Sequence, residues 1–177
     1  LACERVAILM LTDYGESYRV VVNDEAAPSK LPATRGLLGE LREQATCRCF
    51  QNPLDNPAFD GEVDNFLNIT PLESMLFCPI MEGTRFLGAL VAWNRQGSVT
   101  LPSPFSPLDR ELMQSIASHA SIAISKLKQE DDMVRSKLFS EAILDVTRCK
   151  AENAPLETLI ESIITASYKI IRTERVS

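Results

Sequence analysis

The 177-residue sequence predicts an α/β (α+β) fold in which a central antiparallel sheet of five or six strands is flanked by helices and followed by a long C-terminal connector helix. Three observations support this fold class. Short apolar runs rich in β-branched residues, separated by turn residues, are typical of strands. A glycine-containing apolar segment between these runs is typical of a short helix. After Pro107 the chain has no glycine or proline before Pro155, which favours one helix of about 40 residues.

The first half of the chain begins with two predicted strands. Residues 4–13 form an apolar run that ends in turn residues, as expected of a strand buried on both faces. Residues 14–17 are interpreted as a hairpin turn and residues 18–22 as the second strand. Residues 23–32 are polar and contain two prolines, so a loop is expected there. Residues 36–41 begin a short helix whose glycines indicate close backbone packing.

A long irregular segment and a hairpin follow. Residues 48–50 fit a short strand, whereas residues 52–71 contain three prolines and predict a loop. A loop of this length in a compact domain is usually functional. Residues 74–80 and 86–93 are apolar runs joined by a tight turn at residues 82–84, which predicts an antiparallel hairpin.

The start of the long helix carries a capping sequence. Ser106 is expected to cap the first turn, Pro107 to occupy it, and Asp109 to meet the unpaired backbone amides. A cap of this kind stabilises a helix by about 1 kcal/mol.

The composition argues against several classes of partner. Hydrophobic residues make up 45% of the chain and charged residues 24%, which is enough to form a core. A net charge of −6 without clustered Lys and Arg argues against a nucleic-acid partner. No uncharged apolar stretch is long enough to cross a bilayer and no secretory leader is visible, so we expect no membrane partner and a cytoplasmic location.

Neither the cysteines nor the histidine predicts catalysis. The five cysteines are an odd number without a CxxC pair, so reduced thiols of a cytosolic protein and no metal site are expected; they are Cys3, Cys47, Cys49, Cys78 and Cys149. The single histidine, His119, lies among small residues of the long helix, where packing or surface exposure is the simpler role. Because no phosphate-binding loop or HExxH motif is present either, we expect a non-catalytic chain.

The ordered series of segments over residues 4–126 resembles the GAF domain family. The matching pieces are the strand that ends at Asp13, Gly-Leu-Leu-Gly at 36–39, Asn-Pro-Ala-Phe at 56–59, and the segments 74–80, 86–90 and 105–109. Each piece alone is weak, whereas the whole series at these spacings is specific. The resemblance implies the GAF fold and a regulatory, small-molecule-sensing and dimerisation module of a signalling protein.

A second resemblance is to the GAF domains of cyclic nucleotide phosphodiesterases. In that family an Asn-Lys pair is followed by Phe and Asp, and here Asn94, Arg95, Phe105 and Asp109 occupy the corresponding positions. The resemblance implies an ion pair between Arg95 and Asp109 that braces the fold beside the pocket. The alternative is that these residues are simply a strand end and a helix cap.

The chain ends also suggest its organisation. Residues 2–7 resemble residues 172–177, and the apolar helix before the latter looks like the first helix of a GAF domain. We therefore expect a GAF domain without its first helix at 1–126, a connector helix at 127–152, and the first helix and start of the first strand of a second GAF domain at 153–177. The parent is expected to carry at least two GAF domains in tandem, as phosphodiesterases and some cyclases and histidine kinases do.

The phosphodiesterase resemblance implies a cyclic nucleotide, cAMP or cGMP, as a non-covalent allosteric ligand. Its site would lie over the sheet, beneath the middle helix and the long loop, at Asn23, Asp24, Leu37, Leu38, Phe59, Asn68 and Thr70. A helix N-terminus and hydroxyl groups suit the phosphate. Val91 stands where the family has an acidic residue, so a GAF scaffold that has kept dimerisation and lost its ligand is the main alternative.

An enzyme of the free methionine sulfoxide reductase type is the other alternative. Those enzymes are single GAF domains with cysteines around the pocket, and Cys47, Cys49 and Cys78 invite the comparison, although their spacing departs from that family.

The long helix carries a short heptad seam that predicts a homodimer with a modest coiled coil, because Glu130 interrupts it. The seam residues are Ile116, Ala120, Ala123, Leu127, Val134 and Leu138. The apolar face of residues 155–171 is expected to pack on the surface that the missing first helix leaves open, or on its own copy.

Overall fold

The computed structural model describes residues 2–12, 15–21, 27–96 and 104–151, together with residues 155, 157–158, 160–161 and 163–165. The chain divides into two compact units, Leu1–Ala123 and Ile124–Ser177. The first contains the sheet and its helices. The second contains the later part of the long helix α3 (Pro107–Ala151) and the helical residues that follow it.

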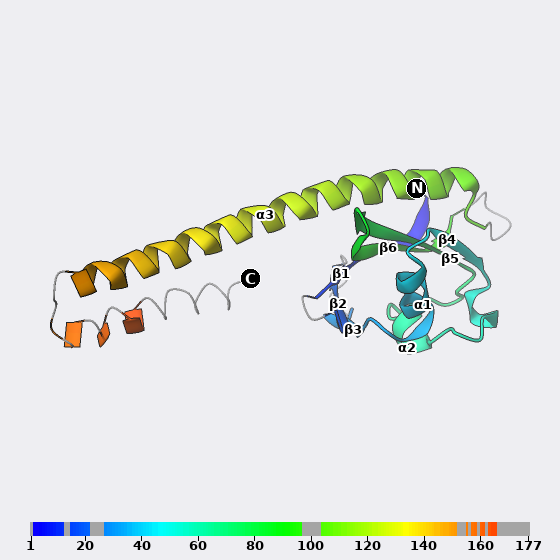
Figure 1. Ribbon diagram of the computed structural model, residues 1–177. Helices are drawn as coiled ribbons and strands as arrows, with labels where there is room; N and C mark the ends of the chain where they lie inside the picture. The colour runs from blue at the N-terminus through cyan, green and yellow to red at the C-terminus, as the bar shows by residue number, and fades with distance from the viewer. Residues whose placement is uncertain are drawn as a thin grey trace. The chain divides into compact units, whose positions relative to one another are not determined.

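A single six-stranded antiparallel sheet forms the centre of the first unit (Figure 1). Its strand order is β3-β2-β1-β6-β5-β4. The strands are β1 (Cys3–Leu11), β2 (Ser17–Val21), β3 (Lys30–Pro32), β4 (Arg48–Gln51), β5 (Ser74–Glu82) and β6 (Arg85–Arg95). The predicted fold class is confirmed, including the long C-terminal helix.

One strand and two short helices lie in segments that the sequence predicts as loops. Strand β3 falls within residues 23–32. It pairs with β2 at the edge of the sheet, and an edge strand tolerates a proline. The 3-10 helix η1 (Pro53–Asp55) and helix α2 (Gly61–Asp64) fall within residues 52–71. All three elements are three or four residues long, too short to show hydrophobic periodicity.

Strand β1 differs from the prediction in its burial. Glu4, Arg5 and Val6 are exposed, whereas Ala7 and Leu9 are buried, so the expected burial on both faces is wrong for the first half of the strand. Ala7 and Leu9 point into the core, but Val6 points to the other face and is 44% exposed. Alternation along a strand places successive side chains on opposite faces, and here only one face is fully covered.

The core lies between the sheet and the helices α1 (Gly36–Gln44) and α2, on the face opposite the first turns of α3 (Figure 1). Its largest fully buried side chains include Trp93, Tyr18, Phe77, Leu37 and Leu38. Trp93 packs edge-on against Phe66, with ring centroids 5.2 Å apart. The side chains beneath α1 are therefore closely packed.

Helix α3 packs on the other face of the sheet through Met113, Ala117 and Ser121, which are buried at four-residue spacing. The Ser121 hydroxyl donates to the carbonyl oxygen of Met81 over 2.5 Å. This contact holds the helix to the end of β5.

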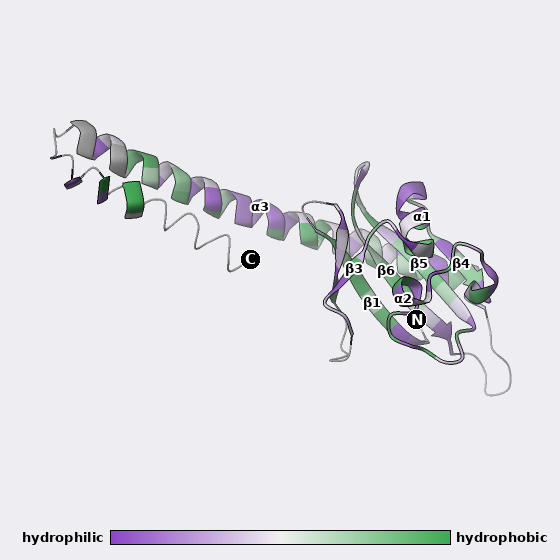
Figure 2. Cartoon of the chain, turned by 90° about the horizontal axis from the view of Figure 1, so that it is seen from below, coloured by the Kyte–Doolittle hydropathy of each residue, from purple (hydrophilic) through white to green (hydrophobic). Residues whose placement is uncertain are grey.

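Apolar and polar residues alternate along the rest of α3, as the hydropathy colours in Figure 2 show. In the second unit, Met133, Val134 and Phe139 are more than half exposed, whereas Ala142 is 5% exposed. The expected packing of residues 155–171 concerns residues that lie mostly outside the described ones. Of its apolar face, Ile160, Ile163 and Ile164 are described, at 46%, 45% and 50% exposure.

Candidate functional site

The N-terminus of helix α1 is occupied by a carboxylate of the same chain. Asp64 accepts hydrogen bonds from the backbone amides of Leu37 and Leu38, each over 2.9 Å. The first turn of a helix leaves such amides without a partner in the helix. Gly36 has φ 68° and allows the close approach, because a Cβ at this position would lie 2.5 Å from a carboxylate oxygen of Asp64.

Helix α2 and the core hold Asp64 in this place. Its carboxylate also accepts a hydrogen bond from the backbone amide of Asp60 over 2.8 Å. Its carbonyl oxygen accepts one from Nε1 of Trp93 over 3.0 Å. The residue is fully buried. Burial raises the pKa of Asp64 above its ordinary value, against the three backbone hydrogen bonds, which favour the ionised form.

The residues predicted to bind a ligand fall into different environments. Leu37 and Leu38 are core residues, and the partly buried Phe59 packs against the same core. Asn68 and Thr70 are exposed on the segment that follows α2. Asn23 and Asp24 lie outside the described residues.

Sequence reasoning missed Asp64 as the partner of this helix terminus. Asp60 caps α2 by accepting a hydrogen bond from the amide of Glu62 over 3.1 Å, and an Asp-Gly-Glu sequence is a recognisable start of a helix. That signal could have placed Asp64 at the end of α2. It could not have shown that α2 lies beside α1.

The ion pair predicted between Arg95 and Asp109 is present. Nε of Arg95 lies 2.6 Å from Oδ2 of Asp109, with side chains 28% and 10% exposed. Ser106 donates to the same oxygen from its backbone amide and its hydroxyl, over 2.8 and 2.6 Å. The two interpretations of the sequence, an ion pair that braces the fold and a helix cap, are therefore both correct, because Asp109 takes part in both. Burial raises the pKa of Asp109, but the Ser106 hydrogen bonds and the Arg95 charge outweigh it and hold that pKa below its ordinary value.

Asn94 completes this structural motif. It has φ 49°, and its Oδ1 accepts hydrogen bonds from the amides of Glu73 and Ser74 over 2.8 and 3.2 Å. Its Nδ2 donates to the carbonyl of Pro71 over 2.7 Å and to the Glu4 carboxylate over 2.8 Å. Phe105 is 6% exposed. The hydrogen bonds of Asn94 fasten the end of β6 to its neighbours.

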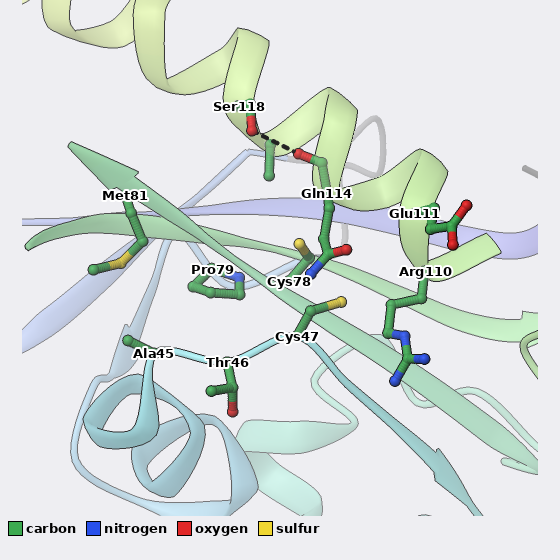
Figure 3. A pocket seen from close by; sticks show the side chains of 11 residues that line it. Ala45, Thr46, Cys47, Cys78, Pro79, Met81, Arg110, Glu111, Gln114 and Ser118 are labelled. Carbon is green, nitrogen blue, oxygen red and sulfur yellow. Dashed lines mark hydrogen bonds between the residues drawn. The ribbon is translucent and has the colours of Figure 1, made fainter. Parts of the chain in front are cut away.

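An open cavity of about 700 Å³ lies between the first turns of α3 and the sheet (Figure 3). Its lining comes from the α1–β4 connection, from β5 and from α3. Cys47, Cys78, Arg110, Glu111 and Gln114 supply its chemically functional side chains. Sequence reasoning grouped Cys47 with Cys78 and missed Arg110.

The predicted dimer seam lies on exposed and half-buried parts of α3. Ile116, Leu127 and Val134 are 50%, 64% and 57% exposed. Ala123 is exposed, and Ala120 and Leu138 are half-buried. Two further apolar side chains precede the predicted seam, because Leu108 and Leu112 are 63% and 45% exposed. Their four-residue spacing ahead of Ile116 was the signal available in the sequence.

Other candidate chemistry is sparse in the part of the chain that the structure describes. Nδ1 of the exposed His119 lies 2.8 Å from the carbonyl oxygen of Ser115, in the preceding helical turn. No group of three or more His, Cys, Asp or Glu among the described residues is arranged to hold a metal ion. Among the same residues, no helix combines the length and apolar character that a membrane span requires.

Residues 1–124 match the family model of the GAF domain. No curated protein sequence matches the chain. Similar solved structures include the GAF domain of a phosphoenolpyruvate-protein phosphotransferase from Coxiella burnetii, with 20% identity, a TM-score of 0.57, and coverage of 72% of this chain and 76% of that one. The second GAF domain of DevS from Mycobacterium smegmatis has 20% identity and a TM-score of 0.53, with 74% and 86% covered.

A third similar structure is an enzyme. The free methionine-R-sulfoxide reductase from Neisseria meningitidis, solved in complex with its substrate, has 13% identity and a TM-score of 0.57, with 72% of this chain and 71% of that one covered. At identities of 20% or less, these three similarities show that the structures share the fold of this chain, and no more.

Proposed function

Because the chain belongs to the GAF domain family, we propose that it is a non-catalytic regulatory module that joins two copies of a signalling protein through helix α3. GAF domains are generally regulatory sensing or signalling modules. In this chain the proposed role is that of a dimerisation scaffold, with α3 as the paired element. The parent protein would bring its effector segments together through this pairing.

The exposed apolar stripe of α3 carries the proposal. In the first unit Leu108, Leu112 and Ile116 are exposed, while Met113 and Ala117 of the same turns are buried against the sheet. In the second unit Leu127 and Val134, which are seven residues apart, are exposed as well. Covering the exposed halves of five such side chains on each of two helices would contribute about 10 kcal/mol, at roughly 1 kcal/mol each. That is comparable with the cost of association, so the pairing is expected to be of moderate strength.

The occupied N-terminus of α1 supports a scaffold that acts without a ligand. A nucleotide phosphate is suited to helix amides, but here the Asp64 carboxylate accepts from the amides of Leu37 and Leu38. The leucines expected to line the pocket are 1% and 0% exposed. A bound nucleotide would need both the carboxylate and the packed side chains to move.

A cyclic-nucleotide-binding module of the phosphodiesterase type is the second candidate. The observation that favours it is the pair of Arg95 and Asp109, which occupies the positions of that family's brace. This candidate requires cAMP or cGMP to bind the isolated domain. The scaffold does not.

Sedimentation of the purified chain tests the proposed function. The wild type is expected to dimerise at micromolar concentration, and the double variant Leu112→Glu/Ile116→Glu to weaken the dimer at least about tenfold, since it places charges in the stripe. Ile122→Glu is the matched control, because Ile122 is 69% exposed but lies about 120° from Ile116 and about 80° from Leu112 around the helix. A wild type that stays monomeric, or a control that dissociates equally, would overturn the proposal. Circular dichroism checks that all three chains keep their helix.

A further inference from the structure

Two thiols meet at the cavity beneath α3. Cys47 lies in the α1–β4 connection and Cys78 in β5, and both line the cavity (Figure 3). Strand β4 pairs with β5, and its first residue, Arg48, lies opposite Phe77. Continuing this register by one residue beyond β4 would set Cys47 opposite Cys78. Both thiols face the same cavity, and each shifts the pKa of the other.

This spacing suits a disulfide. Directly opposed residues of antiparallel strands have Cα atoms about 4.5–5.5 Å apart. A disulfide spans Cα separations of about 4.4–6.8 Å. The register therefore allows Cys47 and Cys78 to be linked without moving either strand.

The two thiols differ in reactivity. The hydrogen bond from Cys78 and the charge of Arg110 hold the pKa of the Cys47 thiol below its ordinary value, in spite of the burial that raises it. The hydrogen bond with Cys47, burial and the Cys47 charge raise the pKa of the Cys78 thiol. The thiolate is the nucleophilic form of cysteine. Cys47 is thus the nucleophile of the pair and Cys78 its protonated partner.

Solvent access also favours Cys47 over Cys78 as the thiol that reacts first. Cys47 is half-buried and lines an open cavity, whereas Cys78, in the same lining, is 1% exposed. A small oxidant that enters the cavity meets Cys47 first. Arg110 extends from α3 toward this region in Figure 3.

We propose that Cys47 and Cys78 form a hydroperoxide-responsive thiol pair, in which Cys47 is oxidised first and Cys78 then closes a disulfide with it beneath α3. This modification site is independent of the dimerisation proposed above.

The chemistry balances with hydrogen peroxide as the oxidant. The Cys47 thiolate attacks one peroxide oxygen, the O–O bond breaks, and the departing hydroxide takes a proton to become water, which leaves Cys47 as a sulfenic acid. The Cys78 sulfur then attacks the Cys47 sulfur, the S–O bond breaks, and hydroxide leaves with the Cys78 proton as a second water. Two thiols and one peroxide thereby give one disulfide and two waters. A dithiol reductant reverses the change.

The first step prepares the second. Conversion of Cys47 to a neutral sulfenic acid removes the negative charge that helps to raise the pKa of Cys78. It also removes the thiolate that held the Cys78 proton by a hydrogen bond. Cys78 therefore becomes easier to ionise at the stage where its sulfur must attack.

Cys49 provides an internal comparison. It lies on β4, two residues after Cys47, and is exposed. Burial of part of its side chain and the Cys47 charge raise the pKa of the Cys49 thiol. It is thus more accessible than Cys47 but less ionised, so accessibility and thiolate character predict opposite orders of reaction.

The test treats the full 177-residue chain, reduced and then freed of reductant, with one equivalent of hydrogen peroxide at neutral pH. Peptide mass spectrometry after alkylation should show Cys47 and Cys78 protected together, with the loss of two hydrogen atoms and no intermolecular link. Cys78→Ser should stop at the sulfenic acid, which dimedone traps on Cys47. Cys47→Ser should slow oxidation at least about tenfold, whereas Cys49→Ser should leave the rate unchanged.

The pH dependence of Cys47 alkylation in Arg110 variants is a second measurement, and it would not change if Arg110 only packed against its neighbours. Arg110→Gln should raise the pH at which Cys47 is half-alkylated by iodoacetamide, and Arg110→Lys should restore the wild-type midpoint. Thermal unfolding of each variant checks the fold. Oxidation of Cys49 before Cys47, a disulfide between chains, or the persistence of both Cys47 and Cys78 as thiols under these conditions would overturn the proposal.

Discussion

Nε of Arg95 donates to Oδ2 of Asp109 over 2.6 Å, which ties the last residue of β6 to the first turn of α3. The bond joins the sheet to the helix that the proposed function uses. It also shares its acceptor oxygen with Ser106, so the helix cap and the ion pair depend on one carboxylate.

Removing the Arg95 charge should destabilise the first unit. For Arg95→Gln we expect a loss of about 1–2 kcal/mol at neutral pH, because the pair is only partly exposed. Arg85→Gln is the matched control, since Arg85 lies 3.9 Å from Glu82 with both side chains exposed. Its loss should stay within about 0.5 kcal/mol.

The same variant carries a pH signature. The folded-state pKa of Asp109 lies below its ordinary value, so its contribution to stability is full above the unfolded pKa and disappears as the pH falls through the folded one. The difference in unfolding free energy between wild type and Arg95→Gln should therefore shrink below about pH 4. Urea unfolding at several pH values measures it, and a difference that grows in acid would contradict the assignment.

Two glycines can separate backbone strain from the contact with Asp64. Gly36 and Gly83 both have positive φ, 68° and 59°, but only Gly36 faces the carboxylate, and a Cβ at Gly83 meets nothing within 4 Å. Gly83→Ala should cost about 1 kcal/mol of unfolding free energy. Gly36→Ala should cost roughly 2 kcal/mol more, because it also pushes the buried carboxylate away from the amides of α1. Equal losses of unfolding free energy for the two variants, measured by urea unfolding, would show that the Asp64 carboxylate can move aside without cost.

Glu130 interrupts the predicted seam, and its replacement should strengthen pairing. Glu130→Leu is expected to tighten the dimer about tenfold, since each copy would gain an apolar side chain in the stripe. Asp132→Leu removes the same charge from another exposed position, on a different side of the helix, and should change the dimer constant little. Sedimentation equilibrium of both variants compares them, and an equal gain would mean that net charge, not the seam, controls association.

Calorimetric titration with cAMP and cGMP discriminates the two candidate functions. The scaffold predicts no binding heat from either nucleotide at up to about millimolar concentration. Saturable binding would favour the second candidate, and Thr70→Ala should then weaken it by about 1–3 kcal/mol if the sequence-predicted site is right. Asn23→Ala is expected to act in the same way.

Long periodic segments were predictable, whereas short elements and long-range pairs were not. The hairpin of β5 and β6 follows from two continuous apolar runs around a tight turn, and the long helix from the absence of glycine and proline. Strand β3 has only three residues and depends on pairing with β2. Sequence periodicity cannot reveal an element whose stability comes from its neighbour.

The candidate sites also differ in how far they could be predicted from the sequence. The pair of Arg95 and Asp109 was predictable because it follows a family resemblance. The bond between Asp64 and the amides of α1 joins residues 26 and 27 positions apart in the chain, and nothing local marks it. The presence of Arg110 in the same cavity lining as Cys47 likewise depends on how α3 crosses the sheet.

Asp64 also acts as an internal competitor for the N-terminus of α1. A group tethered by a flexible chain reaches an effective concentration on the order of millimolar, and Asp64 is further oriented by bonds to Asp60 and Trp93. Asp64 therefore binds the amides of α1 more readily than a free anion can, because its carboxylate is already tethered and oriented there. The apparent affinity of such an anion is reduced by the small fraction of molecules in which the carboxylate has left. In this respect the domain is already liganded by its own chain.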